Sequence, residues 1–165
     1  MTDRRSSRGR QPFAAVREIA APAAALPPPF VHRCRVTWAD CDVAQIAYTG
    51  RLPNFALEAI DAFWDAAVGV DWYRMNLDYG VGTPFVRLEM DFHSPVTPRW
   101  PLDCQVAVTR LGRSSIGFRV TGRQEERDCF TGNFVCVFVN ATTFETLEIP
   151  DSLRTAVAGH LLDGA

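Results

Sequence analysis

A pair of aspartates two positions apart offers the clearest chemical group in this sequence. Asp40 and Asp42 stand just before a loop that contains Thr49 and Gly50. An ionised carboxylate can attack an electrophilic carbon or take a proton from water. We expect Asp42 to act in this way, and Asp40 to hydrogen-bond within the loop and orient it. The alternative for Asp42 is an ordinary loop aspartate that caps backbone N–H groups.

The residues after this loop predict one long amphipathic helix. Apolar residues recur at helical spacing from Leu52 to Ala67, and Pro53 stands near the start. We expect the helix to end near Gly69. The first N–H groups of a helix lack intrahelical partners and carry partial positive charge, so they can polarise a carbonyl oxygen and hold the anion formed there. A carboxylate just upstream could then react with that carbonyl.

Alternating or β-rich segments around this helix predict an antiparallel sheet. The expected strands are 30–38, 84–93, 102–111, 115–126 and 130–144, with a short helical turn at 71–76. Short connections make consecutive strands antiparallel, and one long helix against such a sheet is an α+β architecture. The last strand is apolar on both faces from Phe134 to Val139. Self-association is the most economical way to cover the face that the helix leaves open.

Composition limits the classes of partner. The formal net charge of -2 gives no general basic field for nucleic acid, and no apolar run reaches the ~20 residues of a membrane span. The five cysteines and three histidines are scattered, without a C-x-x-C pair. That spacing favours a reducing cytoplasm and predicts neither a disulfide framework nor a zinc site. We therefore expect no metal.

The 165 residues suggest one domain with a tail at each end. Residues 1–29 are interpreted as an Ala/Pro-rich extension that is flexible or ordered by a partner, and residues 14–21 are compatible with a short helix. The domain covers residues 30–150. Residues 151–165 form a tail in which a short helix could begin with Asp151 or Ser152 as its cap.

Together these features resemble the hotdog-fold acyl-CoA thioesterases of the 4-hydroxybenzoyl-CoA thioesterase type. The matching segments are D-C-D-V-A-Q-I-A-Y at 40–48 with the helix behind it, V-G-T-P at 81–84 and G-R-S-S at 112–115. The resemblance covers about residues 30–150. It implies an α+β hotdog fold, in which a five-stranded antiparallel sheet wraps around one long central helix.

The resemblance also implies roles for individual residues. Asp42 matches the catalytic carboxylate of the family, which acts as a nucleophile or as a base for water. The backbone N–H of Thr49, together with Gly50, matches the group that polarises the carbonyl. The turn of Arg113, Ser114 and Ser115 matches the loop near the nucleotide part of coenzyme A.

Assembly and one departure from the family follow from the same resemblance. The family forms dimers whose sheets join and whose active sites lie at the subunit boundary, and tetramers are common. We therefore expect a homodimer or homotetramer. The sequence departs from the family at Gln45, where a glycine is usual, and this departure bears on the geometry of the loop.

Several side chains near the motif are candidates for a substrate pocket. The pocket candidates are Gln45, Tyr48, Phe55, Thr83 and Pro84, with Trp72, Tyr73 and Phe85 as further aromatic residues. Aromatic residues at such spacings are more often part of a hydrophobic core. Their abundance beside the motif favours a bulky or aromatic acyl group over a long flexible chain.

Other polar residues have simpler interpretations. A second hotdog lineage uses a helix-borne carboxylate, but Glu58 falls on the polar face of the predicted helix, which favours solvent exposure. His93 is interpreted as structural, because no G-x-S-x-G nucleophile elbow is present. Arg113 could contact a phosphate, since arginine suits phosphate groups, although a solvated face is the commoner role of such charges.

The predicted function is hydrolysis of an acyl-CoA thioester to a free acid and coenzyme A. No separate cofactor is expected, because coenzyme A is part of the substrate. One alternative is a hotdog enoyl-CoA hydratase or dehydratase, which would normally need a histidine paired with a carboxylate, and the catalytic loop contains no histidine. The other is a non-catalytic acyl-CoA-binding subunit, which would bind coenzyme A without turnover.

Overall fold

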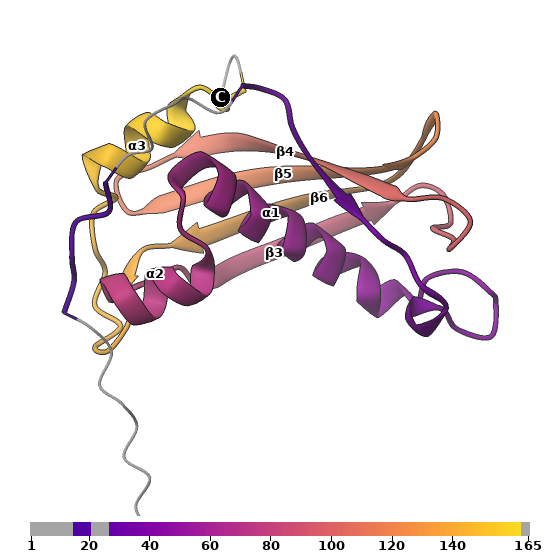
Figure 1. Ribbon diagram of the computed structural model, residues 1–165, viewed down its shortest axis with the longest axis horizontal. Helices are drawn as coiled ribbons and strands as arrows, with labels where there is room; N and C mark the ends of the chain where they lie inside the picture. The colour runs from indigo at the N-terminus through magenta and orange to yellow at the C-terminus, as the bar shows by residue number, and fades with distance from the viewer. Residues whose placement is uncertain (1–14, 21–26, 163–165) are drawn as a thin grey trace, which may run out of the picture.

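One long helix lies across a five-stranded antiparallel sheet (Figure 1). The computed structural model describes residues 15–20 and 27–162. Helix α1 spans Leu52–Val68, and the sheet has the order β1-β4-β5-β6-β3. Its strands are β1 (Phe30–Cys34), β3 (Phe85–Phe92), β4 (Leu102–Leu111), β5 (Ser115–Gln124) and β6 (Arg127–Val137). The predicted α+β architecture, with the sheet wrapped around one long helix, is confirmed.

The apolar stripe of α1 and the inner face of the sheet form the core. Phe63 and Trp64 are fully buried, and both make edge-on ring contacts with Phe118 of β5, at centroid distances of 5.9 and 5.7 Å. Burying a large apolar side chain contributes roughly 1.5–3 kcal/mol, so this helix face holds the two layers together. The helix ends where Gly69 adopts a φ of 75°, a left-handed conformation that glycine tolerates.

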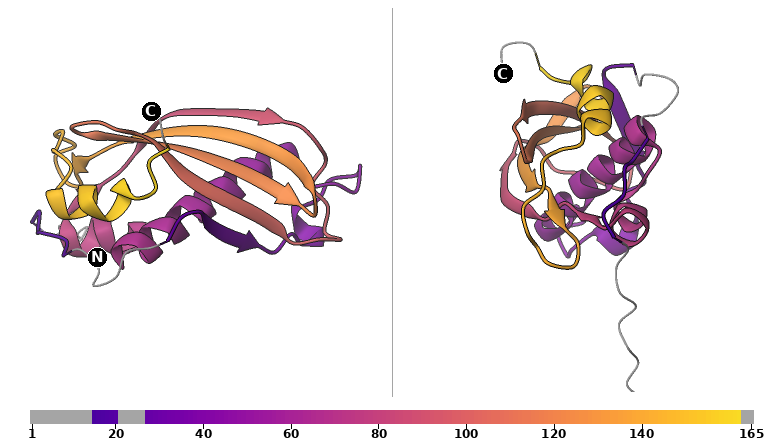
Figure 2. Two further views of the ribbon diagram at one scale, coloured as in Figure 1. Left: turned by 90° about the horizontal axis from the view of Figure 1, so that it is seen from above. Right: turned by 90° about the vertical axis from the view of Figure 1, so that its left-hand side faces the viewer.

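Shorter elements complete the fold. Two 3-10 turns flank the predicted catalytic loop, η1 (Trp38–Asp40) and η2 (Thr49–Arg51). Helix α2 (Trp72–Tyr79) follows α1, and a two-stranded sheet joins β2 (Val81–Gly82) to β7 (Val139–Asn140). Helix α3 (Asp151–Ala158) lies near α2 at one end of the molecule, while the loop before α1 lies at the other end (Figure 2).

The structure corrects several predicted boundaries. The first strand ends at Cys34, four residues before its predicted end. The last strand starts earlier than predicted, at Arg127, because Glu125, with φ 54°, turns the chain directly after β5. It also ends at Val137, because the Phe138 amide donates to the Ser114 carbonyl (2.8 Å) and the chain then pairs with β2. The predicted helical turn at 71–76 extends to Tyr79.

The two tails also differ in detail from the predictions. The described residues 15–20 are not helical, so the short helix considered for 14–21 is wrong there. Instead this segment packs on the domain: Ile19 is fully buried, and its carbonyl accepts a hydrogen bond from Ser152 Oγ (2.6 Å). Residues 1–14, 21–26 and 163–165 lie outside the described part of the chain. A C-terminal helix is present, but Pro150, rather than Asp151 or Ser152, occupies its N-cap position.

The edge of the sheet that β3 forms is only partly covered by α1. On β3, Leu88 and Phe92 pair in register with the buried residues Phe134 and Phe130, so all four share the face that α1 covers. Leu88 and Phe92 nonetheless remain 43% and 50% exposed, because α1 does not reach this edge. A bulge between Phe85 and Arg87 breaks the alternation predicted for the start of this strand.

Within the described residues, no helix is long and apolar enough to cross a membrane.

Candidate functional site

Asp40 fixes the loop that leads into α1. Its carboxylate accepts hydrogen bonds from the backbone N–H and hydroxyl of Thr37 (2.8 and 2.7 Å) and from the guanidinium of Arg51 (2.7 and 2.9 Å). Asp40 is buried, and these bonds, those of Thr37 first, lower the pKa of its carboxyl. Because Arg51 belongs to η2, the ion pair ties η1 to the start of the long helix. The expected orienting role of Asp40 agrees with these contacts.

Asp42 lies at the exposed tip of this loop. The loop closes through a β-bridge between Cys41 and Ala47, and the Asp42 amide donates to the Ile46 carbonyl (3.0 Å). One carboxylate oxygen, Oδ1, accepts from the Ala44 amide (2.8 Å). The other, Oδ2, has no hydrogen-bond partner among the residues that the structure describes. Asp42 thus combines a fixed orientation with one oxygen open to a reacting group.

Gln45 adopts a left-handed backbone conformation, with a φ of 63°. Such a conformation suits glycine and is unfavourable for a residue with a β-carbon. This conformation gives a physical reason for the glycine that the resemblance leads one to expect here. The turn is left-handed although the residue is glutamine. Gln45 lines a surface cavity of about 550 Å³ together with Trp38, Thr97 and neighbouring residues.

The start of the helix presents the amides that the sequence analysis singled out. In η2 the first paired amide is that of Arg51, which donates to the Tyr48 carbonyl (2.7 Å). The amides of Thr49 and Gly50 precede it and so have no partner within this turn. The Tyr48 ring covers Gly50 so closely that a β-carbon there would come within 2.6 Å of ring atom Cε1. Glycine at this position therefore lets an aromatic ring lie beside the free amides.

A first cavity, of about 270 Å³, opens beside these amides. It is lined by Ile46 and Thr49 of the loop, by Leu52 of α1, and by Phe92 and His93 at the end of β3. The cavity is mostly apolar, and one side of it is the exposed sheet edge. We call it the amide cavity. A thioester carbonyl placed here would lie beside Thr49, the first residue of the 3-10 turn that leads into α1.

A second cavity, of about 330 Å³, lies at the opposite end of β3. Its lining includes Trp72 of α2 and the predicted pocket residues Thr83 and Pro84, with Phe85 beside them. The rings of Trp72 and Phe85 meet edge-on, with centroids 5.4 Å apart. We call it the aromatic cavity. Phe55, another predicted pocket residue, is instead buried in the core with Arg51 above its ring.

The predicted nucleotide-binding turn lies at the same end of the sheet as the aromatic cavity. Ser115 pairs with Val137 in β6, next to the pairing of Phe85 with Cys136. The backbone of this turn is held in place, because the Ser114 and Arg113 carbonyls accept hydrogen bonds from Phe138 (2.8 Å) and Ile149 (2.9 Å). The Arg113 side chain is largely exposed and forms an ion pair with Glu148 (3.3 Å).

Within one copy of the chain, the predicted site residues therefore form two groups. Thr49 lines the amide cavity, where β3 ends, while Asp42 and Gly50 belong to the loop that leads to Thr49 and to the 3-10 turn that contains it. Thr83, Pro84 and the 113–115 turn lie where β3 begins. An eight-residue strand is about 25 Å long, so the groups are too far apart to hold one small acyl group together.

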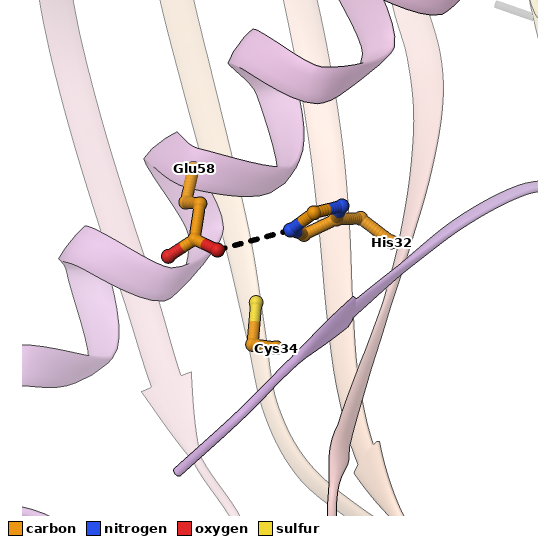
Figure 3. A group of neighbouring side chains, drawn as sticks. All are labelled: His32, Cys34 and Glu58. Carbon is orange, nitrogen blue, oxygen red and sulfur yellow. Dashed lines mark hydrogen bonds and ion pairs between the residues drawn. The ribbon is translucent and has the colours of Figure 1, made fainter. Parts of the chain in front are cut away.

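Two histidine contacts were not anticipated from the sequence. His93 lines the amide cavity, and its Nε2 lies 3.3 Å from Thr131 Oγ1. The Nε2 atom of His32 in β1 lies 3.0 Å from Oε1 of Glu58 in α1 (Figure 3). For Glu58, the sequence predicted only exposure to solvent. Linear spacing gave no signal for either contact, because each joins segments that are distant in sequence. Neither histidine takes Asp42 as its partner in these contacts.

Comparison with known proteins identifies the family. A model of the thioesterase-like superfamily matches residues 36–157. A crystal structure of a thioesterase superfamily protein from Jannaschia sp. CCS1 is 54% identical, covers 84% of this chain and 97% of that chain, and has a TM-score of 0.79. None of the curated proteins matches the chain.

More distant structures share the fold. A 1,4-dihydroxy-2-naphthoyl-CoA thioesterase from Synechocystis is 17% identical, covers 78% of this chain and 95% of that chain, and has a TM-score of 0.71. A gentisyl-coenzyme A thioesterase is 23% identical, covers 78% of this chain and 99% of that chain, and has a TM-score of 0.70. The predicted hotdog fold and the predicted enzyme class, a thioesterase, are thus confirmed, and the chain belongs to the thioesterase-like superfamily.

Proposed function

We propose that the protein hydrolyses an acyl-CoA thioester to a free acid and coenzyme A. The observation that carries this proposal is the arrangement at the start of α1. The exposed carboxylate of Asp42 belongs to a loop that Asp40 and Arg51 clamp to the first helical turn. The amides of Thr49 and Gly50 have no partner within that turn, and Thr49 lines the amide cavity.

In the proposed reaction, the thioester carbonyl oxygen binds the amides of Thr49 and Gly50, which stabilise the oxyanion that develops there. Removing one such donor in other enzymes costs ~2.7–4 kcal/mol in barrier height. Asp42 either attacks the carbonyl carbon and expels the coenzyme A thiolate, or takes a proton from the water that attacks. In the first route, water then cleaves the anhydride and returns the carboxylate to Asp42. Both routes consume one water and release one acid and one thiol.

The proposal includes a two-fold dimer in which β3 pairs with β3 of a second copy. An exposed edge strand with unpaired backbone groups and apolar side chains favours pairing with another strand. Antiparallel pairing about a two-fold axis would place the beginning of one β3 against the end of the other. The amide cavity of one copy would then face the aromatic cavity of the other, which brings the two groups of site residues together.

The aromatic cavity supports a bulky or aromatic acyl group as the proposed substrate. Its volume of about 330 Å³ and its lining of Trp72, Phe85 and Phe144 suit a flat apolar ring. The indole N–H of Trp72 is buried and has no hydrogen-bond partner among the described residues. A buried donor of this kind can be satisfied by a ligand, so we propose that the acyl group carries a hydrogen-bond acceptor.

Coenzyme A is proposed to bind along the 113–115 turn. Arg113 can exchange its exposed ion pair with Glu148 for a phosphate group, because an exposed pair of this kind contributes only about 0–1 kcal/mol. The proposed chemistry uses water, a carboxylate and amides, and requires no separate cofactor. A cytoplasmic location is proposed because all five cysteines are free thiols. A tetramer would require a further contact, for which the second face of the sheet is the proposed surface.

A panel of acyl-CoA substrates tests the reaction class. Thiol release should be measured together with the absorbance of a conjugated enoyl-CoA. A thioesterase releases thiol in proportion to the acid formed, with the highest kcat/KM for an aromatic acyl group. Loss of conjugation without thiol release would identify a hydratase instead. Binding of coenzyme A without any turnover across the panel would identify a non-catalytic subunit.

A further inference from the structure

Three potential metal ligands meet between the edge strand β1 and helix α1. His32 and Cys34 stand two residues apart on β1, and Glu58 reaches them from the helix (Figure 3). Their ligand atoms all lie within 4.8 Å of one another, and His32 Nε2 lies 3.0 Å from Glu58 Oε1. The residues come from segments far apart in the sequence, so only the packing of β1 on α1 creates this cluster.

The donor set suits one class of cation. Imidazole nitrogen, thiolate sulfur and carboxylate oxygen are the three ligand types of tetrahedral zinc sites, at distances of about 2.0–2.3 Å from the metal. Two ligands at these distances in a tetrahedron lie about 3.3–3.8 Å apart, so side-chain movements of roughly an ångström would suffice. Magnesium and calcium prefer oxygen ligands alone and do not match the cluster. A thiolate and a carboxylate together neutralise the charge of Zn²⁺.

One of the three side chains in the cluster is buried, and the other two are partly exposed to solvent. Cys34 is 1% exposed, whereas the side chains of His32 and Glu58 are 27% and 57% exposed. A cation can therefore arrive from solvent along the two exposed ligands, with Cys34 beneath it. Cys104, which stands opposite His32 in β4, is fully buried and is not part of the cluster, so Cys34 supplies its sulfur.

We propose that His32, Cys34 and Glu58 form a Zn²⁺ site that fastens the edge strand β1 to α1. Water would fill the fourth position, and binding would release the thiol proton of Cys34 to solvent. The site stands apart from the proposed chemistry, since Glu58 lies eight residues beyond Gly50, about 12 Å along the helix axis. Its effect is on the stability of the β1–α1 contact. This proposal departs from the expectation, based on linear spacing, that the chain has no metal site.

Titration of tag-free protein with Co²⁺, followed by displacement with Zn²⁺, tests the site. Wild-type protein should bind one Co²⁺ per chain and show a thiolate-to-cobalt charge-transfer band that Zn²⁺ abolishes. Zn²⁺ at about 100 times its Kd should raise the Tm by roughly 5–10 °C. Cys34→Ser should remove the charge-transfer band, and Glu58→Gln should weaken binding by at least about tenfold.

Two matched variants control for non-specific binding by a thiol or a carboxylate. Cys41→Ser and Glu89→Gln alter residues outside the cluster and should keep the band, the stoichiometry and the Tm shift. If Cys34→Ser fails to fold, Glu58→Gln still decides the question, because this side chain is largely exposed. If wild-type protein does not bind Co²⁺ stoichiometrically, the proposal is wrong and the cluster is only an ion pair beside a buried thiol. Unchanged affinity in Glu58→Gln would equally overturn the proposal.

Discussion

At the scale of single residues, Gln45 is the position where this chain differs most informatively from its family. Its φ of 63° places a residue with a β-carbon where glycine is favoured. The sequence alone identified the departure, because the family motif surrounds it. It did not indicate whether the loop would change shape or keep a glycine-like turn. The backbone of Asp42 to Ala47 keeps a glycine-like turn, in which the Gln45 amide donates to the Asp42 carbonyl (3.0 Å).

Replacing Gln45 by glycine should therefore stabilise the protein. A left-handed conformation costs an L-residue roughly 1–2 kcal/mol, and the greater entropy of glycine in the unfolded chain offsets part of the gain. We expect Gln45→Gly to raise the free energy of unfolding by about 0.5–1 kcal/mol in urea denaturation. Gln45→Ala keeps the β-carbon and should give no such gain. Equal stability of the two variants would show that the left-handed turn carries no strain.

At the scale of secondary-structure elements, the contacts between η1 and the first turn before α1 hold the proposed catalytic loop in place. Asp40 bonds to Thr37 on one side and to Arg51 on the other, and it is buried between them. The Arg33–Asp103 pair offers a comparison, because it has a similar fork of bonds (2.7 and 2.9 Å) but joins two exposed side chains. Asp40 differs from Asp103 in its burial and in the two further hydrogen bonds that it accepts from Thr37.

Asp40→Asn should destabilise the fold by roughly 1–3 kcal/mol at neutral pH, because a bond to a charged buried group is lost. Asp103→Asn should cost less than about 1 kcal/mol. The pKa of Asp40 is lowered on folding, so its contribution is complete above the ordinary aspartate pKa of about 3.9 and is lost as the pH falls through the folded value. Urea denaturation should therefore show that the free energy of unfolding of wild type exceeds that of Asp40→Asn by more at pH 7 than at pH 3. An equal advantage at both values would contradict this role for the carboxylate.

The elements themselves were largely predictable, because hydrophobic periodicity is a local signal. Helix α1 and strand β4 match their predicted ranges closely, since caps and turn residues such as Gly69 mark their ends. The short pairing of β2 with β7 was not predicted, because two-residue strands carry no period. The contact of Ile19 with the domain was missed for a similar reason. It depends on α2 and α3, which are distant in sequence.

The roles of the candidate site residues stay predictions, whereas the structure shows where these residues lie. The family motif located the Asp42 loop and the amides of Thr49 and Gly50 in one region. Sequence could not show that Thr83 and Arg113 lie at the far end of β3, because the strand order depends on long-range pairing. Nor could it separate Phe55, which is core, from Phe85, which lines a cavity. His93 and the His32–Glu58 contact likewise arise only from tertiary packing.

At the scale of the whole molecule, the separation of the two cavities makes assembly part of the proposed mechanism. A single copy leaves the amide cavity and the aromatic cavity at opposite ends of β3. Two apolar residues of this edge are left uncovered on the side of α1: Leu88 lies between the two cavities, and Phe92 lines the amide cavity. A two-fold dimer through β3 would cover these residues and complete both sites at once. Activity should therefore depend on the oligomeric state.

Leu88→Lys should convert the proposed dimer to a monomer and reduce kcat/KM by at least about tenfold, because a buried lysine without a partner opposes assembly. Light scattering coupled to size-exclusion chromatography gives the mass, and thiol release gives the rate. Val31→Lys is the matched control, since Val31 is 48% exposed on β1 at the opposite edge of the sheet. It should leave the rate unchanged and the protein at least dimeric. A fully active Leu88→Lys monomer would contradict the composite site.

The most direct test of the account is the single-turnover rate of thioester hydrolysis in Asp42→Asn, measured on the best acyl-CoA of the panel. Asparagine keeps the shape of the side chain but can neither attack the carbonyl as an anion nor take a proton from water. We predict a fall of at least about 100-fold relative to wild type. Asp65→Asn, which alters an exposed carboxylate near the far end of α1, should keep the wild-type rate. An Asp42→Asn rate equal to that of Asp65→Asn would contradict the central claim.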